Sequence, residues 1–338
     1  MTPRWSPFHL RLHRLLLQRP ALLPQGTSLV LAVSGGQDSM ALTGLLLDLV
    51  RLHGWTLHLW HGDHGWRQES AQQAQELAGW AQGQGLSIHM ARWEPAVQKN
   101  GDAQRTKTSE AQAREWRYSC LVREAERLGA RRVVTGHTAS DRAETLLLHL
   151  ARGSHRRGLA GMPRERELAP GIQLVRPLLG FSRTETANVC TELGLPIWHD
   201  SSNADPRFSR NRVRHEVMPV LEALHPGANR RLAATAERLE AEQEAETELI
   251  GLALRGLHAQ GSEGAGVLRR QELVAQSSAN QRRLLQHWYR CHTGQPLPSR
   301  QLELLLQRLA KGQPPGVMHL AAGWQLHWDR STLHLQQR

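Results

Sequence analysis

Hydrophobic and polar positions along the first half of the chain predict strands and helices in turn. Residues 28–33 (SLVLAV) form a short apolar run that is typical of a buried strand. A Gly-Gly pair follows, and the next segment carries apolar residues at helical spacing: Leu42, Leu45, Leu46, Leu49 and Val50. The pattern therefore predicts a strand, a loop and a helix in succession.

The same alternation continues toward the middle of the chain. The predicted elements are residues 55–60 (strand), 70–82 (helix), 87–93 (strand), 109–128 (helix) and 131–135 (strand). Another helix is expected to begin at the capping box formed by Ser182 and Glu185 and to end at Gly194. Because strands that alternate with helices favour a parallel sheet with helices on both faces, we predict a doubly wound α/β domain.

The pattern changes after Pro219. A Pro-Gly pair precedes a long helical segment over 228–257, whose middle is strongly acidic. We place a domain boundary between residues 219 and 220, so that 220–338 form a smaller, mainly helical C-terminal domain. Three alternating segments near its end predict a short antiparallel sheet: 317–320, 324–328 and 332–335.

Length and charge fit this division and suggest a partner. A chain of 338 residues is long enough for two domains, each with its own core. The net charge of +11 favours a polyanionic partner such as a nucleic acid. However, only three of the 42 basic residues are lysines, and an excess of arginine also follows from genomic codon bias. Both interpretations stay open at this point.

Cysteine usage and the N-terminus indicate a cytoplasmic protein. The three cysteines are far apart in the sequence and favour neither a zinc site nor a disulfide framework: Cys120, Cys190 and Cys291. The apolar run at residues 15–17 is flanked by Arg14, Arg19 and Pro20, and it is too short for a signal peptide or a membrane span. We therefore expect no contact with a membrane.

A short motif between the first predicted strand and its helix has the features of a phosphate site: Ser34, Gly35, Gly36, Gln37, Asp38 and Ser39. Glycines let the backbone approach an anion, and the N–H groups at a helix start point toward it. Asp38 places a carboxylate where anions bind, which suits a Mg²⁺ ion that bridges it to a pyrophosphate. A tight turn would explain the glycines but not the carboxylate.

This loop resembles the SGGxDS loop of the pyrophosphatase-loop (PP-loop) ATPases, and no GK[ST] sequence of a Walker A loop occurs. The resemblance implies that residues 34–39 bind ATP and that ATP is cleaved to AMP and pyrophosphate. The superfamily includes amidating ligases, tRNA thiolases and lysidine synthetases, so the loop alone leaves the reaction open.

A second polar cluster follows the second predicted strand and contains His61, Asp63 and His64. Residues 61–67 resemble the HxDHGLR stretch of lysidine synthetases, and the carboxyl ends of strands are where open α/β sheets bind their ligands. We expect these three residues to contribute to the ATP site. Metal ligation and ordinary polarity at a strand end are the alternatives, although the spacing matches no zinc site.

The third cluster, residues 135–145, begins another predicted helix with Ser140 as its N-cap. Asp141 and Glu144 are three residues apart, which places both carboxylates on one face of the first helical turn. That arrangement suits either a cationic substrate or the helix dipole itself. The segment resembles the GHHxDDQxET pattern of lysidine synthetases, which implies that Asp141 and Glu144 bind lysine. The chain departs from this pattern at Thr138 and Ser140.

Two further segments extend the resemblance to the lysidine synthetases. Residues 113–118 resemble their ARxxRY motif and contain Arg114, while residues 200–214 resemble DxSN…RNxIR. The second segment carries a basic run that suits tRNA phosphates: Arg207, Arg210, Arg212 and Arg214. A solvated charged face is the competing interpretation.

The resemblance implies a ligase that joins L-lysine to the wobble cytidine of tRNA(Ile). A cytosine oxygen would attack the α-phosphate of ATP, and the lysine amine would then displace AMP. In that scheme Asp38 holds Mg²⁺, Arg114 and His137 surround the reacting phosphate, and the C-terminal domain binds tRNA. A tRNA thiolase and a non-catalytic RNA-binding protein are the alternatives, and a homodimer is left open.

Overall fold

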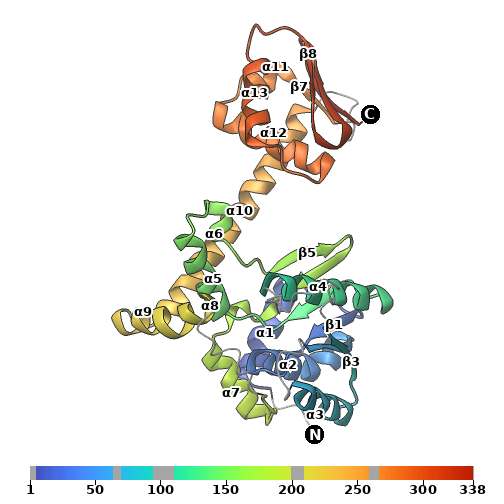
Figure 1. The fold of residues 1–338 in the computed structure, drawn as a ribbon, viewed down its shortest axis with the longest axis vertical. Coiled ribbons are helices and arrows are strands. Elements are labelled where there is room, and N and C mark those ends of the chain that lie inside the picture. The colour runs from blue at the N-terminus through green and yellow to red at the C-terminus, as the bar shows by residue number, and fades with distance from the viewer. Residues whose placement is uncertain (1–4, 64–69, 94–109, 199–208, 259–265, 338) are drawn as a thin grey trace, which may run out of the picture. The chain divides into compact units, whose positions relative to one another are not determined.

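The computed structural model, shown in Figure 1, describes residues 5–63, 70–93, 110–198, 209–258 and 266–337. They form two compact units, Met1–Glu240 and Ala241–Arg338. The domain boundary that the sequence placed between residues 219 and 220 stays a prediction. No helix in the described part of the chain has both the length and the apolar character that crossing a membrane requires.

The first unit is built on a six-stranded sheet in the order β3-β2-β1-β4-β6-β5. Five strands run parallel, and only the edge strand β5 is antiparallel to its neighbour. Their bounds are β1 Ser28–Ala32, β2 Thr56–Asp63, β3 Ser87–Arg92, β4 Arg132–Thr135, β5 Glu165–Ala169 and β6 Ile172–Val175. The predicted parallel sheet is confirmed, whereas β5 and β6 were not predicted.

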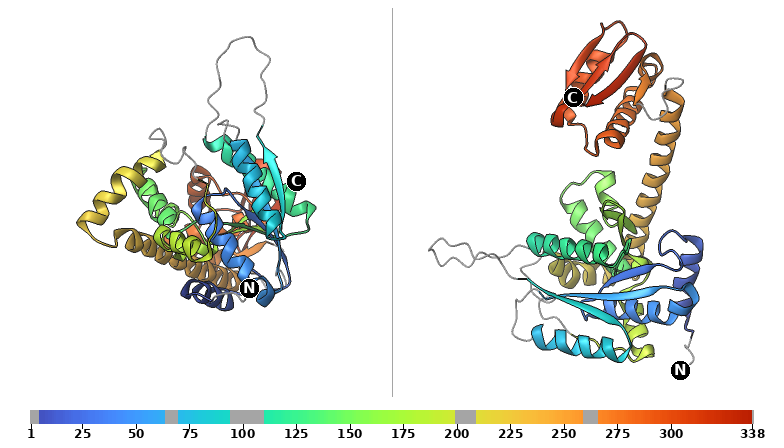
Figure 2. Two further views of the ribbon diagram at one scale, coloured as in Figure 1. Left: turned by 90° about the horizontal axis from the view of Figure 1, so that it is seen from below. Right: turned by 90° about the vertical axis from the view of Figure 1, so that its right-hand side faces the viewer.

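Alternate residues of the central strands point to opposite faces of the sheet, and each face has its own apolar core. Leu29 and Leu31 of β1 lie in one core, whereas Val30 between them lies in the other. Helices that supply the first core are α1 Pro7–Gln18, α2 Gln37–His53, α3 Ser70–Gly83 and α7 Arg183–Leu193. Helix α4 (Glu110–Arg127) supplies the second, and Figure 2 shows α3 and α4 on opposite sides of the sheet. The doubly wound arrangement is therefore confirmed.

Helix boundaries follow local capping chemistry. The predicted capping box of α7 is present, since the amide of Glu185 donates to the Ser182 hydroxyl at 3.2 Å and Gly194 ends the helix in the left-handed conformation. The predicted N-cap of α5 (Ala139–Ala151) was wrong, because Thr138 caps this helix and Ser140 lies within it. The remaining short helices of this unit are α6 Arg156–Leu159, η1 Pro177–Gly180, α8 Ser209–Arg212, η3 Val213–Val217 and α9 Met218–Leu224.

The second unit combines helices with a four-stranded antiparallel sheet in the order β7-β10-β9-β8. Its elements are β7 Val267–Arg269, α11 Arg270–Val274, α12 Ser278–Thr293, α13 Ser299–Leu309, β8 Gly316–His319, η4 Ala321–Gly323, β9 Trp324–Trp328 and β10 Thr332–Gln337. Leu326 and Leu333 point from the sheet into a core with Trp288 and Leu305. The three predicted strands are confirmed, and β7 was not predicted.

The first acidic residues of the long helix α10 (Ala228–Leu257) pair with buried arginines of the first unit. Arg142, which is 1% exposed, donates to Glu240 at 2.6 Å and to the carbonyl of Met162 at 3.2 Å. Arg164 is also buried, and it donates to Glu237 at 2.9 Å. Two acidic residues of α10 thus neutralise two buried guanidinium groups of the first unit, where unpaired charge would be costly.

We predict that Glu240→Ala lowers the free energy of unfolding of the first unit by about 3 kcal/mol. Among the described residues, the Nη1 and Nε atoms of Arg142 have no hydrogen-bond acceptor, so loss of Glu240 leaves its charge with only the more distant carboxylate of Glu237, at 3.8 Å. Chemical denaturation followed by circular dichroism measures the change. Glu244→Ala on the exposed part of the same helix is the matched control and should change stability by less than about 0.5 kcal/mol. Equal effects of the two substitutions would contradict the assignment.

Candidate active site

The predicted phosphate loop lies between β1 and α2, as the sequence indicated. Gly35 has a φ of 82°, a left-handed conformation that favours glycine, and Gly36 directly precedes the helix. The loop is held by its own serines, because the Ser34 and Ser39 hydroxyls are 3.1 Å apart and Ser39 donates to the carbonyl of Gly36 at 2.8 Å. The N–H groups of the first turn of α2 have no partners within the helix and remain donors for an anion.

Asp38 lies in the first turn of α2 and faces α7. Its Oδ1 accepts a hydrogen bond from the hydroxyl of Thr186 at 2.5 Å, and its Oδ2 is 3.6 Å from Nε of Arg183. Burial raises the pKa of Asp38 above its ordinary value, although Arg183 opposes this shift. A carboxylate whose charge is under-compensated beside a phosphate loop fits Mg²⁺, which binds to one or two carboxylates together with phosphate oxygens.

Helix α7 contributes residues that sequence reasoning missed. The side-chain amide of Gln37 donates to the carbonyl of Arg183 at 2.6 Å and to the Thr186 hydroxyl at 2.8 Å. Gln37 therefore positions α7 against the loop, and α7 in turn presents two polar side chains to Asp38. The sequence located this helix by its caps, but nothing in the spacing indicated which loop it contacts.

Gly136 follows β4 and packs directly on the backbone of the phosphate loop. A β-carbon at this position would lie 2.7 Å from the carbonyl oxygen of Asp38 and 2.9 Å from the amide nitrogen of Ser39. Real β-carbons essentially never come this close to backbone atoms. The third cluster and the phosphate loop are therefore in contact, as expected for adjacent parallel strands that end at the same edge of a sheet.

The second cluster lies at the carboxyl end of β2, next to the phosphate loop. The ring of His61 hydrogen-bonds the carbonyl of Val33 at 2.8 Å, and burial lowers the pKa of His61, which keeps the ring neutral. His61 and Asp63 line a cavity of about 270 Å³, whose other walls include Ala74, Met90 and Ala91. His64 lies outside the described residues.

His137 is half-buried and lies just after the carboxyl end of β4. Its Nδ1 is 2.8 Å from the hydroxyl of Thr135. Burial lowers the pKa of His137 to about 3; Asp141 opposes this shift, and Arg176, Arg210 and Arg114 add to it. At neutral pH the imidazole is therefore neutral and can take part in hydrogen bonds as an uncharged group.

Arg114 lies over the ring of Tyr118, with its guanidinium carbon 5.1 Å from the ring centroid. Arg176, at the carboxyl end of β6, is almost fully buried, and this burial lowers its pKa to about 10. Its Nη1 donates to the carbonyl of Pro163 at 2.6 Å, while its Nε has no partner. Sequence analysis assigned no role to Arg176, because β6 itself was not predicted; an arginine directly after that strand was the available signal.

Asp141 and Glu144 lie together on α5, as their spacing predicted, but their partners are the arginines that the sequence assigned to tRNA. Arg210 donates to Glu144 at 2.9 Å and to Asp141 at 3.1 Å. Arg214 donates to the two oxygens of Glu144 at 2.7 and 2.9 Å and to Asp141 at 3.3 Å. We call these four residues the charge cluster. Burial opposes ionisation of Asp141, yet Arg210 and His137 hold its pKa down at about 2.

The other members of the predicted basic run are placed differently. Arg212 faces away from the charge cluster and forms an exposed ion pair with Glu216 at 2.9 Å. Arg207 lies outside the described residues. The run is therefore not one surface: two of its arginines point inward to carboxylates and one points to solvent.

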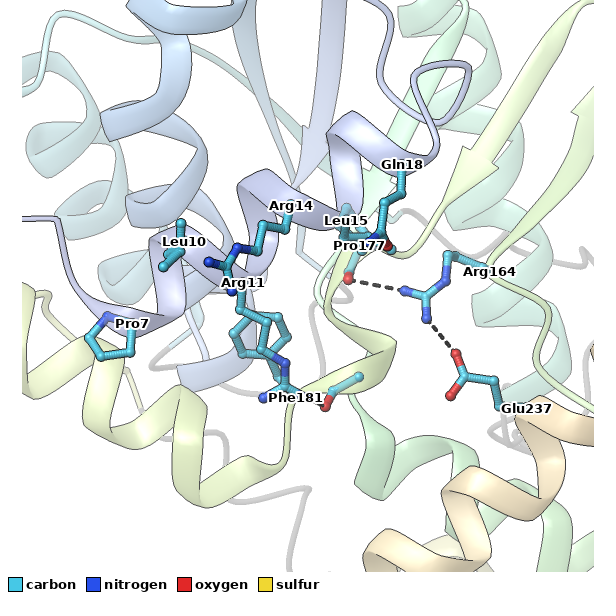
Figure 3. A pocket seen from close by; sticks show the side chains of 11 residues that line it. Pro7, Leu10, Arg11, Arg14, Leu15, Gln18, Arg164, Pro177, Phe181 and Glu237 are labelled. Atoms are coloured by element: carbon cyan, nitrogen blue, oxygen red, sulfur yellow. Dashed lines mark hydrogen bonds and ion pairs between the residues drawn. The ribbon is translucent and has the colours of Figure 1, made fainter.

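A larger open cavity, of about 520 Å³, lies between α1, η1 and the beginning of α10 (Figure 3). Arg11, Arg14 and Phe181 line it, and Figure 3 shows Arg164 between the Pro177 carbonyl and Glu237 at one side. No residue of the phosphate loop or of the charge cluster lines this cavity. We therefore do not assign the reaction to it.

The cysteines give little support to sulfur chemistry. All three cysteines are unpaired, and Cys120 and Cys190 are buried. Burial, together with the charge of Asp38, raises the pKa of Cys190 to about 11, so it is a thiol at neutral pH. Within the described ranges, no group of three or more His, Cys, Asp or Glu residues is arranged to hold a metal ion.

A parallel sheet with a glycine-rich SGGxDS loop opening its first crossover helix defines an ATP-binding domain of the PP-loop class. Residues 8–221 match the family model of the PP-loop domain, and residues 268–334 match that of the TilS substrate binding domain. The chain belongs to the tRNA(Ile)-lysidine synthase family. It is 50% identical to the tRNA(Ile)-lysidine synthase of Parasynechococcus marenigrum over 336 residues, which cover 98% of this chain and 95% of that protein.

Further comparisons agree with this assignment. A tRNA(Ile)-lysidine synthase of Prochlorococcus marinus is 41% identical over 338 residues, with 98% of this chain and 96% of that protein covered. Among solved structures, the U34-tRNA thiolase NcsA from Methanococcus maripaludis superposes with a TM-score of 0.57 at 16% identity, covering 69% of this chain and 77% of that one. At that identity the likeness concerns the fold alone.

We predict that Gly136→Ala weakens ATP binding at least about tenfold, which corresponds to about 1.4 kcal/mol. The added β-carbon can be accommodated only if the backbone of Asp38 and Ser39 moves. Titration calorimetry with ATP measures the effect. Gly79→Ala on the exposed surface of α3 is the matched control, because a β-carbon there meets no atom within 4 Å. Unchanged ATP affinity in a folded Gly136→Ala protein would show that the loop tolerates displacement.

Proposed function

We propose that this protein joins L-lysine to the wobble cytidine of tRNA(Ile) in an ATP-dependent ligation that releases pyrophosphate and AMP. Family membership over nearly the whole chain supports the reaction class, which forms a carbon-nitrogen bond. One observation carries the assignment of residues: the contact of Gly136 with the phosphate loop places α5, with its two buried carboxylates, beside the loop. We place the enzyme in the cytoplasm, where its substrates occur.

In the first step, the carbonyl oxygen of cytosine attacks the α-phosphate of ATP, and the bond to pyrophosphate breaks. The loop of residues 34–39 supplies backbone and hydroxyl donors to the leaving pyrophosphate. Asp38 would hold a Mg²⁺ ion against the phosphates, and the ion would neutralise the charge that develops there. We place the nucleoside of ATP near the small cavity lined by His61 and Asp63, whose walls are largely apolar.

In the second step, the ε-amine of lysine attacks the activated carbon of cytosine, and AMP leaves with the oxygen. The amine must be neutral when it attacks, and it must lose a second proton as the new bond forms. His137 is neutral at physiological pH and lies beside the charge cluster, so we place it as an uncharged hydrogen-bonding group next to the reacting phosphate. Arg114 and Arg176 provide positive charge near His137, where the phosphate of the adenylate carries its negative charge.

The thiolase alternative is weaker, even though a thiolase shares the fold. Sulfur transfer requires a reactive cysteine, commonly one of a pair with a lowered pKa. Here Cys190 is held as a thiol by burial and by Asp38, and Cys291 belongs to the second unit. The arrangement of Asp38 and the carboxylates also has no use in a protein that only binds RNA.

The test of the reaction is mass spectrometry of tRNA(Ile) after incubation with enzyme, ATP, Mg²⁺ and lysine. We predict that Asp38→Asn lowers pyrophosphate release and lysine incorporation at least about 100-fold, because a phosphate-bound ion loses its protein ligand. The melting temperature should be unchanged or higher, since burial disfavours the charge that this substitution removes. Lysine incorporation at the parental rate would refute the role of Asp38.

A second prediction separates the ligase from the thiolase. Replacement of the three cysteines by alanine or serine should preserve lysine incorporation within about threefold in any variant that stays folded, because the proposed steps use no thiol. The three positions are Cys120, Cys190 and Cys291. The same assay with single replacements identifies any loss that follows from packing of the buried residues. Complete loss of turnover in a folded triple variant would favour sulfur chemistry.

A further inference from the structure

We infer that Trp198 holds the phosphate loop, residues 34–39, in the conformation that binds the phosphates of ATP. In this role, which rests on the proposed function, Trp198 acts through the backbone of the loop and is a positioning residue. Trp198 belongs to none of the sequence motifs described above. The contacts that support its role come from three sides: the loop itself, helix α3 and the apolar core.

The residues that follow α7 run along α2 and reach the phosphate loop. A β-carbon at Gly44 of α2 would lie 2.7 Å from Cδ1 of Leu195, so the chain packs closely on that helix. Further along, the amide of Trp198 donates to the carbonyl of Gly35 at 3.0 Å. The chain is therefore anchored on α2 before it contacts the loop.

The hydrogen bond from Trp198 fixes the peptide unit between Gly35 and Gly36. A trans peptide is planar and carries its carbonyl and N–H groups on opposite sides. Because the carbonyl of Gly35 accepts from Trp198, the N–H of Gly36 is turned the other way, toward the hydroxyl of Ser34 at 3.3 Å. That N–H group is one of the donors that the loop offers to an anion.

The indole ring covers Gly35 at the place where a side chain would otherwise stand. A β-carbon at Gly35 would lie 3.2 Å from Cε3 of Trp198 and 3.6 Å from its Cβ. Two adjacent glycines have more conformational freedom than other residues, so ordering this loop around a ligand has a high entropic cost. A ring that packs on the loop before ATP arrives lowers that cost, and preorganisation of this kind raises affinity.

The orientation of the ring is fixed by a second hydrogen bond. Nε1 of Trp198 donates to Oε2 of Glu76 on α3 at 2.7 Å, and the side chain of Gln72 donates to the other oxygen of this carboxylate at 2.9 Å. Trp198 also packs, partly buried, against the apolar core that α2 and α3 share. Its contact with Gly35 is therefore directional and does not follow from apolar packing alone.

An aromatic side chain beside an ATP site can instead stack on adenine, and pyrophosphate separates the two roles. Pyrophosphate carries the groups that the loop binds but has no base. If Trp198 holds the loop, its loss should weaken the binding of ATP and of pyrophosphate alike. If the indole contacts adenine, its loss should weaken the binding of ATP alone.

We predict that Trp198→Ala weakens the binding of ATP and of pyrophosphate, each with Mg²⁺, at least about tenfold, or about 1.4 kcal/mol. Titration calorimetry measures both affinities. In steady-state modification of tRNA(Ile), the KM for ATP should rise by a similar factor while kcat stays within about threefold, because bound nucleotide then orders the loop. Trp198→Phe, which keeps a ring on Gly35, should restore both affinities to within about threefold of the parental values.

Trp80→Ala is the matched control, because Trp80 on α3 also packs, partly buried, against the same apolar core. Both affinities should be unchanged in this variant. Hydrogen exchange adds a direct measurement of the loop: without nucleotide, peptides that contain residues 34–39 should exchange faster in Trp198→Ala than in the parent or in Trp80→Ala. Saturating pyrophosphate with Mg²⁺ should abolish the difference.

The outcomes distinguish this role of Trp198 from the proposed function. If Trp198→Ala lowers the melting temperature as Trp80→Ala does and leaves both affinities unchanged, Trp198 only packs on the core and the inference is overturned. Weaker binding of ATP alone would also overturn it, in favour of a contact with adenine. If the parent protein binds ATP and pyrophosphate but forms no lysine adduct on tRNA(Ile), the proposed function fails while the role of Trp198 stands.

Discussion

The parallel pairing of β1 with β4 is the constraint on which the site depends. These two strands are neighbours in the sheet, and both end at the same edge. The loop that follows β1 and the turn that follows β4 must therefore share one small space, and only a glycine at position 136 lets their backbones touch. From this contact the remaining groups take their places: α2 begins at the loop and α5 begins at the turn. Helix α7 contacts the first through Gln37 and the second through Ser140.

Buried charges in the first unit are compensated to different degrees at different places. On α10, acidic residues neutralise guanidinium groups that have no function in the proposed reaction. In the active site, by contrast, Asp38 and Arg176 retain incomplete compensation, and their pKa values shift accordingly. Strained or under-compensated charge is expected where a ligand supplies the missing partner.

The sequence predicted the parts of the fold that have long or sharply bounded patterns. The phosphate loop, the helix bounded by Ser182 and Gly194, and the long helix α10 were all located correctly. Strands β5, β6 and β7, each of three to five residues, were not predicted. The missed strand β6 also concealed Arg176.

The sequence indicated which residues belong to the candidate site, but it did not indicate which of them contact one another. Spacing showed that Asp141 and Glu144 share a helix face, yet it could not show what faces them. The arginines that meet them lie about seventy residues further along the chain, Arg210 on α8 and Arg214 in the π-helical segment η3. A linear sequence carries no signal for such a register, so one continuous basic run was assigned to one surface.

The cap of α5 connects the start of that helix to the charge cluster. Oδ2 of Asp141 accepts hydrogen bonds from the amide and the hydroxyl of Thr138, at 2.8 and 3.0 Å, while Oδ1 faces the two arginines. One carboxylate thus serves both as the cap of the helix and as a wall of the charge cluster. A movement of either arginine away from Oδ1 therefore acts on the same carboxyl group that caps α5, so the first turn of the helix and the ion pairs are mechanically coupled.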